Sequence, residues 1–293
     1  MTTATLDTPT PAAPATRRFA QLDVFCSEVL RGNPLAVVVD GAGLSDARMQ
    51  DFARWTGLSE TTFLLPPTDA AADYQVRIYT PGGELPFAGH PTLGSARAWL
   101  MHGGVPRQPG RVVQQCGVGL VEVQLQPGGR LAFAAPPLRR GEVDADLLAS
   151  VCTALGLEAA EVQVATWLDN GPQWLGLLLA DAARVRALQP DHAALRHLAK
   201  VGVVGPCAPG EATRFELRGF AAPLGVNEDP VTGSLNASVA QWLMDEGIAP
   251  ASYVAAQGSA LGRAGRVHLD RDAAGTVWVG GEVQPCIAGT VTL

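Results

Sequence analysis

Two stretches of the chain repeat one order of residue types, and this internal duplication constrains the fold more than any other feature. Residues 86–101 read PFAGHPTLGSARAWLM and residues 226–244 read VNEDPVTGSLNASVAQWLM. Each runs from a polar residue through Pro, two further residues and Gly-Ser into an Ala-rich segment ending in Trp-Leu-Met. Gly32 lies 62 residues before Gly94, and Gly171 lies 62 residues before Gly233. Solenoid repeats are about 20 to 50 residues long, so a repeat of about 140 residues indicates a duplicated domain.

The residue pattern within each half predicts an α+β unit. Short apolar runs such as LAVVV and YQVRIYT are bounded by Gly and Pro, as is typical of strands, and helical stretches such as SDARMQDFARWTG lie between them. We therefore expect two pseudo-symmetric domains, each a mainly antiparallel sheet wrapped on its helices, with a small-ligand site in the cleft between them. The predicted segments are a disordered tail, an N-terminal domain and a C-terminal domain, at residues 1–18, 19–128 and 129–280.

The charge of the chain argues against a nucleic-acid partner. The formal net charge is -7 and the pI is near 5.2, and the sequence contains no cluster of Lys and Arg that could neutralise phosphates. An anionic substrate must then be held by local donors such as the N-termini of helices.

Other features predict a soluble protein of a reducing compartment. The five cysteines are scattered and lack the spacing of a zinc site, so no metal is expected. No apolar run approaches the length of a membrane span, and the first residues lack the apolar core of a secretory signal. We expect a cytoplasmic protein without a membrane partner.

The duplicated stretches predict two anion-binding helix starts. Each places a polar residue, His90 or Asp229, before a Pro at a plausible first helical position and before small residues whose N–H groups are free. Alternatively, Asp229 simply caps a helix and His90 has a structural role. Their equivalent positions in a duplicated element favour a shared function.

Glu60, in GLSETTFLLPP, is the third candidate residue. It lies where a helix ends and an apolar strand begins, and burial without a cation would raise its pKa into the range useful for acid/base catalysis. The alternative is an exposed Glu at a strand end. The corresponding part of the second half, LAKVGVVGP, has no acid, so Glu60 breaks the symmetry.

Nucleotide-binding and nucleophile motifs are absent from the sequence. It contains no GxGxxG before a helix, no Walker motif and no GxSxG elbow. The RGNP segment at residues 31–34 is interpreted as a tight turn between two strands.

The chain resembles the PhzF family, the phenazine-biosynthesis isomerases and their relatives. The matching segments run in the family's order from about residue 20 to the C-terminus, and ELPFAGHPTLG together with EDPVTGS is a specific signature. The other segments are DVFCSEVLRGNPLAVVVD, MQDFARWTGLSETTFLL, VRIYTPGG and GSALGRAGRV.

The resemblance implies the diaminopimelate-epimerase-like fold, in which two similar domains each roll an antiparallel sheet around a central helix. It further implies that the last strand, about residues 281–293, packs on the first domain, that no cofactor is used, and that the protein is a homodimer. Epimerases of this fold carry a Cys at the helix start of each domain, and this chain has none there, which excludes a thiol-pair mechanism.

The resemblance also assigns roles to residues. It implies that Glu60 is the catalytic carboxylate and that His90 and Asp229 are the polar pair flanking the ligand. Three further residues match positions that hold the substrate: Gly89, Gly233 and Ser234.

A single carboxylate suits an isomerisation in which one group removes a proton and returns it elsewhere on the same face of the substrate. We therefore expect a cofactor-independent isomerase of a small, acidic, conjugated substrate. Two alternatives stay open. One is a racemase or epimerase that uses His90 and Asp229 from opposite faces, and the other is a non-catalytic protein that binds small acids.

Overall fold

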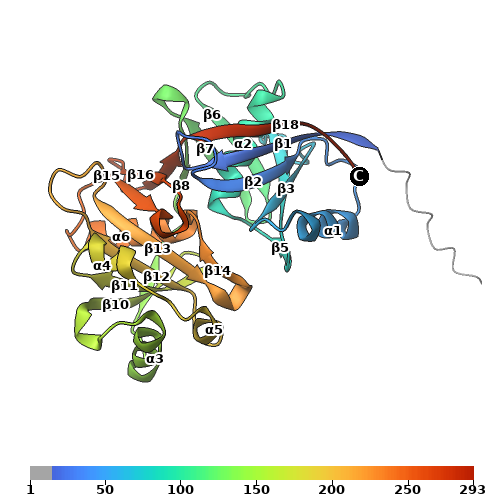
Figure 1. The fold of residues 1–293 in the computed structure, drawn as a ribbon. Helices are drawn as coiled ribbons and strands as arrows, with labels where there is room; N and C mark the ends of the chain where they lie inside the picture. The colour runs from blue at the N-terminus through green and yellow to red at the C-terminus, as the bar shows by residue number, and fades with distance from the viewer. Residues whose placement is uncertain (1–14) are drawn as a thin grey trace, which may run out of the picture.

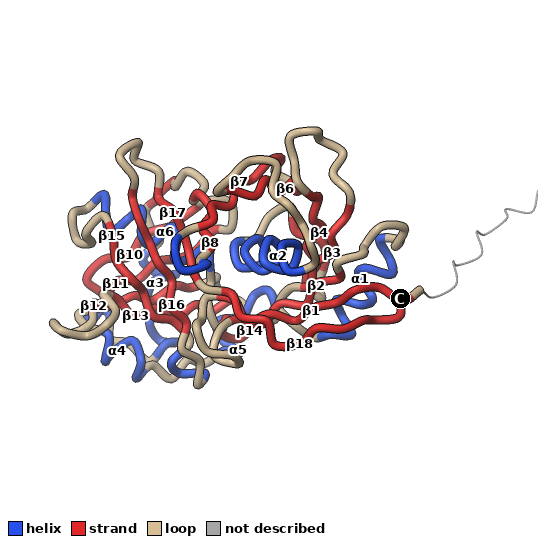
Figure 2. Tube along the Cα trace, turned by 90° about the horizontal axis from the view of Figure 1, so that it is seen from above, coloured by secondary structure: helices blue, strands red, loops and turns tan. Residues whose placement is uncertain are grey.

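The computed structural model describes residues 15–293, and the first part of this chain forms a sheet rolled around one helix (Figure 1). That helix, α2 (Gly89–Met101), lies among the strands and is buried along residues 89–96 (Figure 2). A helix buried on all sides must carry small or apolar side chains, as GHPTLGSA does. The other elements are β1 (Thr16–Val24), β2 (Asn33–Val38), α1 (Asp46–Thr56), β3 (Thr61–Leu65), β4 (Tyr74–Thr80), β5 (Gly83–Leu85), β6 (Arg111–Cys116), β7 (Gly119–Leu125) and β8 (Leu131–Ala134).

The second half has the same plan around α6 (Gly233–Asp245), whose residues are also mostly buried. It adds two helices on its outer face, α3 (Ala145–Leu155) and α5 (His192–Leu195) (Figure 1). The remaining elements are β9 (Arg139–Gly141), β10 (Val162–Asp169), β11 (Gln173–Leu179), α4 (Ala182–Ala187), β12 (Val201–Pro206), β13 (Phe215–Ala221), β14 (Val226–Asp229), β15 (Ser252–Gln257), β16 (Gly265–Arg271), β17 (Val277–Gly281) and β18 (Val283–Thr292).

The strand pairings repeat between the halves. In the first half β2 pairs parallel with β3, β3 antiparallel with β4, and β4 parallel with β6. In the second half β11 pairs parallel with β12, β12 antiparallel with β13, and β13 parallel with β15. The predicted α+β class with two pseudo-symmetric halves is confirmed, and each sheet is mixed because these crossovers keep some neighbours parallel.

The strands β8 and β18 link the two halves through backbone pairing. β8 pairs with β7 on one side and with β17 of the second half on the other. The last strand, β18, leaves the second half and pairs antiparallel with β1 from Val24 back to Thr16, so the C-terminus lies beside the start of β1 (Figure 1). These pairings show that the last strand returns to the first half, as predicted.

The predicted tail is too long at its C-terminal end. Residues 1–14 lie outside the described residues, but Thr16, Arg17 and Arg18 belong to β1 and not to a tail. They are ordered because β18 supplies backbone partners for them, as in the pairing of Thr16 with Thr292. Within residues 15–293, no helix has both the length and the apolar character needed to cross a membrane.

The two duplicated stretches fold differently at their prolines. Pro91 lies inside the first turn of α2, whereas Pro230 precedes α6 by three residues. The prediction of a Pro at the first helical position was therefore wrong in both halves. The structurally equivalent helix starts are Gly89 and Gly233, and Gly94 lies within α2.

Candidate active site

The first turns of α2 and α6 meet at the junction of the two halves. A Cβ placed on Gly233 would lie 3.2 Å from the Cα of Gly89 and 3.3 Å from the backbone nitrogen of His90. Glycine is required here because backbone opposes backbone. Among the described residues, no side chain caps either helix start. Two positive dipole ends and their N–H groups therefore converge on one place.

Glu60 and His90 face each other at this junction. Glu60 immediately precedes β3, and its Oε2 lies 3.6 Å from the Nε2 of His90, the second residue of α2. The Glu60 side chain is 17% exposed and that of His90 is 5% exposed. Within residues 15–293, neither Glu60 Oε2 nor His90 Nε2 has a hydrogen-bond partner. This pair is thus an acid and a base with free atoms directed toward one another.

Asp229 joins the site from the second half through Asn33. The Asn33 amide nitrogen donates to Asp229 Oδ1 at 2.9 Å and to the Val231 carbonyl at 2.9 Å, and it lies 3.5 Å from His90 Nδ1. Asp229 is the last residue of β14, and its Oδ2 accepts from the Thr232 hydroxyl at 2.6 Å. Both carboxylate oxygens of Asp229 are therefore occupied, unlike Oε2 of Glu60.

Burial shifts the protonation equilibria of all three candidates. Burial raises the pKa of Glu60 to about 8, and the nearby negative charge of Asp229 adds to the increase. Burial also raises the pKa of Asp229 to about 6, against the hydrogen bonds from Thr232 and Asn33 that favour its charged form. Burial lowers the pKa of His90 to about 3. At pH 7 the site therefore holds a mostly protonated Glu60, a neutral His90 and a mostly ionised Asp229.

Besides Thr232, two polar residues that hold Asp229 in place, Gln257 and Asn33, were not predicted. Gln257, at the end of β15, donates to the Asp229 carbonyl at 3.0 Å and to Thr232 Oγ1 at 2.9 Å, and it accepts from the Thr232 N–H at 3.0 Å. Asn33, the second of them, belongs to the segment interpreted only as a turn. It opens β2 with its side chain buried, because Asp23 accepts from the N–H groups of Arg31 and Gly32 and fixes the preceding loop.

Ser234, expected to hold the substrate, is itself held by the second half. Its hydroxyl accepts from the indole N–H of Trp174 at 3.2 Å, and its carbonyl accepts from the Asn170 amide at 3.0 Å. Within the described part of the chain, the Ser234 hydroxyl donates to no acceptor, so its hydrogen is available to a ligand. Gly89 and Gly233 contribute only backbone to the site, as expected for residues at a helix start.

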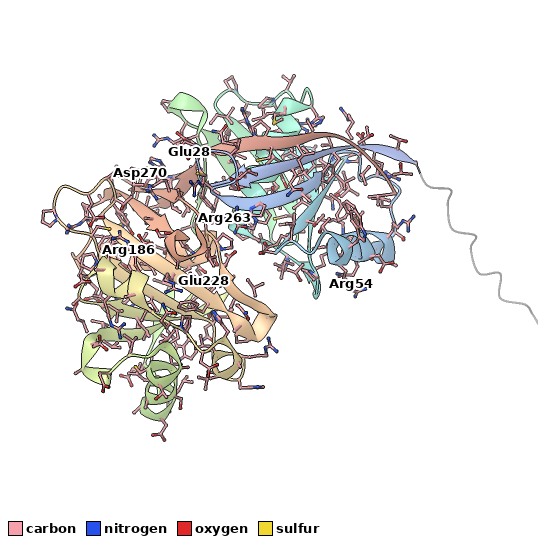
Figure 3. The ribbon with its side chains drawn as sticks, in the orientation of Figure 1. Glu28, Arg54, Arg186, Glu228, Arg263 and Asp270 are labelled. Carbon is pink, nitrogen blue, oxygen red and sulfur yellow. The ribbon has the colours of Figure 1, made fainter. Side chains whose placement is uncertain are left out.

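The two halves are also tied together beside this site. The Arg263 guanidinium donates to the carbonyl of Leu30 at 3.1 Å, and Arg31 donates to the Gly262 carbonyl at 2.8 Å. Figure 3 shows Arg263 between the halves. Among the described residues, no three His, Cys, Asp or Glu side chains are grouped as a metal site would require.

Comparison with known proteins identifies sequences that are similar to this chain. A family model described as PhzC-PhzF, phenazine biosynthesis-like protein, matches residues 22–288. Trans-2,3-dihydro-3-hydroxyanthranilate isomerase of Pseudomonas aeruginosa is 35% identical over 266 residues, which cover 88% of this chain and 91% of the relative.

Solved structures share the fold at lower identity. A Bacillus anthracis phenazine biosynthesis protein of the PhzF family has a TM-score of 0.83 at 20% identity, covering 95% of this chain and all of that one. A hydroxyproline epimerase of Agrobacterium vitis has a TM-score of 0.60 at 14% identity, covering 95% of this chain and 93% of that one. The predicted epimerase-like fold is confirmed.

Proposed function

The chain belongs to the phenazine biosynthesis-like family, several of whose relatives are named isomerases, and we propose that it isomerises a small conjugated acid by moving a proton within the substrate. Glu60 would carry the proton from one carbon to another at the junction of the two halves. No cofactor takes part in the proposed step.

One observation carries this proposal. Glu60 Oε2 is buried, lies 3.6 Å from His90 Nε2, and has no hydrogen-bond partner within residues 15–293. A carboxyl group with a raised pKa and a free oxygen can accept a proton as a base and return it as an acid near neutral pH. Asp229 is less suited to this role because Asn33 and Thr232 already occupy its oxygens.

The proposed step balances without an external reactant. The Glu60 carboxylate removes a proton from a carbon adjacent to the conjugated system, and the electron pair of that C–H bond shifts into the π system. The protonated Glu60, whose acid proton exchanges with water, then delivers a proton to another carbon, which moves the double bond. His90 and Asp229 would orient the substrate, and the free N–H groups at Gly233 and Ser234 would bind its carboxylate.

Epimerisation is the second candidate, and the position of Asp229 favours it. Inversion at one carbon requires a group on each face of the substrate, and Asp229 approaches from the half opposite Glu60 and His90. The same scaffold could instead bind small acids without turnover, but a free buried carboxyl beside a neutral imidazole is costly without a chemical role.

The test is product analysis with dihydroaromatic amino acids, trans-2,3-dihydro-3-hydroxyanthranilate among them, using wild type and Glu60→Gln. A shifted double bond, detected by NMR spectroscopy, supports isomerisation, and inversion at one carbon, detected by chiral chromatography, supports epimerisation. We expect a shifted double bond and a loss of about 10²- to 10⁴-fold in turnover with Glu60→Gln. Turnover near that of wild type would contradict the role of Glu60.

A further inference from the structure

Gln257 bonds both ends of the short segment that leads from Asp229 into α6. Its side-chain nitrogen donates to the Asp229 carbonyl at 3.0 Å, and its side-chain oxygen accepts from the backbone N–H of Thr232 at 3.0 Å. A backbone N–H can only donate and a carbonyl can only accept, so the amide fits one way round. Gln257 is 1% exposed, and the Asn236 amide donates to the same oxygen at 2.8 Å. These contacts fix the orientation of the Gln257 amide.

This orientation decides where the Thr232 hydroxyl donates its hydrogen. The side-chain nitrogen of Gln257 lies 2.9 Å from Thr232 Oγ1 and can only donate, so Thr232 Oγ1 accepts there. The hydroxyl hydrogen is then directed to Asp229 Oδ2, 2.6 Å away. Asp229 Oδ1 accepts from Asn33 at 2.9 Å. Each oxygen of Asp229 thus faces a donor whose direction is set by other contacts.

A donor at each oxygen suits the carboxylate form of Asp229 and opposes the acid form. A proton on Oδ2 would meet the Thr232 hydrogen, and a proton on Oδ1 would meet the amide hydrogens of Asn33. Within residues 15–293 the Thr232 hydroxyl has no other acceptor for its hydrogen. A buried donor that loses its acceptor is costly, and hydrogen bonds to a charged group are the stronger ones. These contacts therefore work against burial, which raises the pKa of Asp229 to about 6.

The titratable groups around Asp229 do not supply this stabilisation. Glu228 precedes Asp229 and adds a negative charge, which Arg218 of β13 balances at 2.8 Å. Burial raises the pKa of Glu60 to about 8 and lowers that of His90 to about 3, so both are neutral near pH 6, where Asp229 titrates. Hydrogen bonds from neutral donors therefore favour the charged form of Asp229.

The first half contains a similar Gln that has no connection to the site. Gln114 in β6 is 0% exposed, accepts from the Tyr74 hydroxyl at 2.9 Å and donates to Thr92 at 3.0 Å. Thr92 is the fourth residue of α2, just as Asn236 is the fourth residue of α6. Gln114 thus supports a central helix as Gln257 does, and it offers a matched control for a merely structural role.

We propose that Gln257 is a positioning residue of the reaction, which turns the Thr232 hydroxyl toward Asp229 and so keeps Asp229 a carboxylate that accepts hydrogen bonds from the substrate. This inference rests on the proposed function, in which Asp229 orients the substrate. Each carboxylate oxygen can accept a second hydrogen bond, so an N–H or O–H group of the substrate still finds an acceptor there. Burial raises the pKa of Glu60 and the charge of Asp229 adds to that increase, so Gln257 also acts on Glu60.

The experiment measures the titration of the Asp229 carboxyl group by carbon NMR spectroscopy, in protein that is isotope-labelled at its aspartate carboxyl groups. Asp229→Asn identifies the resonance by its absence. In Gln257→Met the Thr232 hydroxyl can turn away from Asp229, so the midpoint should rise by about one pH unit. Thr232→Val, which has no hydroxyl, should raise it similarly, whereas Thr232→Ser should titrate as wild type does. Gln114→Met should leave the midpoint unchanged.

Three results would overturn the assignment. The first is a Gln257→Met variant that titrates as wild type does, and the second is an equal shift in Gln114→Met, as general loosening of the core would produce. The third is a wild-type Asp229 that is still protonated at pH 7. If Gln257→Met does not fold, Thr232→Val decides, because a midpoint equal to that of wild type would show that the Thr232 hydroxyl does not stabilise the carboxylate.

Failure of the proposed function is distinguishable from failure of this inference, since the titration requires no substrate. If the midpoints shift as expected but wild type converts none of the dihydroaromatic acids, the isomerase proposal fails and the role of Gln257 stands. If wild type isomerises a substrate and Gln257→Met changes neither the Asp229 midpoint nor the acid limb of the pH profile of kcat/KM, the isomerase proposal stands and the role of Gln257 fails.

Discussion

Near neutral pH, Glu60 is mostly protonated and His90 is neutral, so neither buried side chain carries a charge. A protonated carboxyl and a neutral imidazole lie 3.6 Å apart, so the carboxyl can lose a proton and the imidazole can gain one when a substrate arrives. At high pH Glu60 must ionise, and at low pH His90 must be protonated. Each of these buried charges lowers the free energy of unfolding.

The direction of each effect follows from the shift in pKa. Glu60 has a folded pKa of about 8, above its ordinary value of 4.5, so its contribution to stability is present below pH 4.5 and is lost as the pH rises through 8. His90 has a folded pKa of about 3, below its ordinary value of 6.5, so stability is lost as the pH falls below 6.5.

The first prediction concerns stability as a function of pH. At high pH wild type must ionise the buried Glu60, whereas Glu60→Gln has no group to ionise there. The difference in free energy of unfolding, variant minus wild type, should therefore increase by about 1–3 kcal/mol between pH 5 and pH 8.5. Urea denaturation at both pH values measures it. Glu28→Gln, at an exposed position (Figure 3), is the control and should show no such change. A difference between Glu60→Gln and wild type that does not vary with pH would contradict the burial of the Glu60 charge.

The second prediction concerns the amide that joins the two halves. Asn33→Ala leaves Asp229 Oδ1 and the Val231 carbonyl without their donor, so we expect a loss of about 2 kcal/mol in stability. Turnover should fall as well, because Asp229 loses the contact that fixes it beside His90. The control is Asn227→Ala on the exposed side of β14. Equal stability of the two variants would show that the Asn33 bridge is not formed.

At the scale of elements, the site depends on how closely two helices approach. The starts of α2 and α6 touch through glycine, and in the proposed mechanism the N–H groups of α6 bind the substrate at this contact. A side chain at Gly233 would separate the two helix starts, because the atoms that it meets belong to the backbone of Gly89 and His90.

The third prediction tests this contact. The Cβ of Gly233→Ala would lie 3.2 Å from Gly89, so we expect a loss of about 1–3 kcal/mol in stability and about 10²-fold in turnover. Gly83→Ala is the control, since nothing lies within 4 Å of a Cβ at Gly83. Thermal unfolding and steady-state kinetics measure the two effects. Turnover of Gly233→Ala equal to that of Gly83→Ala would contradict the need for close approach.

The sequence predicted the elements better than their boundaries. Strands such as β4 and the buried helices α2 and α6 have strong patterns, because their faces are uniformly apolar or small. The start of α2 was misplaced because Pro91 suggested a first helical position, whereas the chain enters the helix two residues earlier, at Gly89. Local sequence could not show this, since the start is set by contact with Gly233 in the other half.

The candidate site was only partly predictable. Glu60, His90 and Asp229 were chosen from local patterns and from the family resemblance, and the fold brings them to one junction. Asn33 and Gln257 were missed because RGNP also describes an ordinary turn and YVAAQ an ordinary strand end. Their roles come from hydrogen bonds between segments far apart in the chain, which no local pattern carries.

At the scale of the whole molecule, duplication supplies two similar helix starts, and divergence gives each half its own chemistry. The first half contributes Glu60, His90 and Asn33, and the second contributes Asp229. β18 returns from the second half to pair with β1, so the relative position of the halves is fixed by strand pairing as well as by the helix contact. The homodimer implied by the resemblance stays a prediction.

The central claim is that Glu60 transfers a proton to and from carbon. The most direct measurement is deuterium uptake from heavy water into trans-2,3-dihydro-3-hydroxyanthranilate and related dihydroaromatic acids, followed by mass spectrometry with wild type and Glu60→Gln. We expect uptake at one carbon with wild type and a loss of about 10²- to 10⁴-fold in its rate with Glu60→Gln. Equal uptake by both proteins would contradict the claim, as would the absence of uptake by wild type from every acid that it binds.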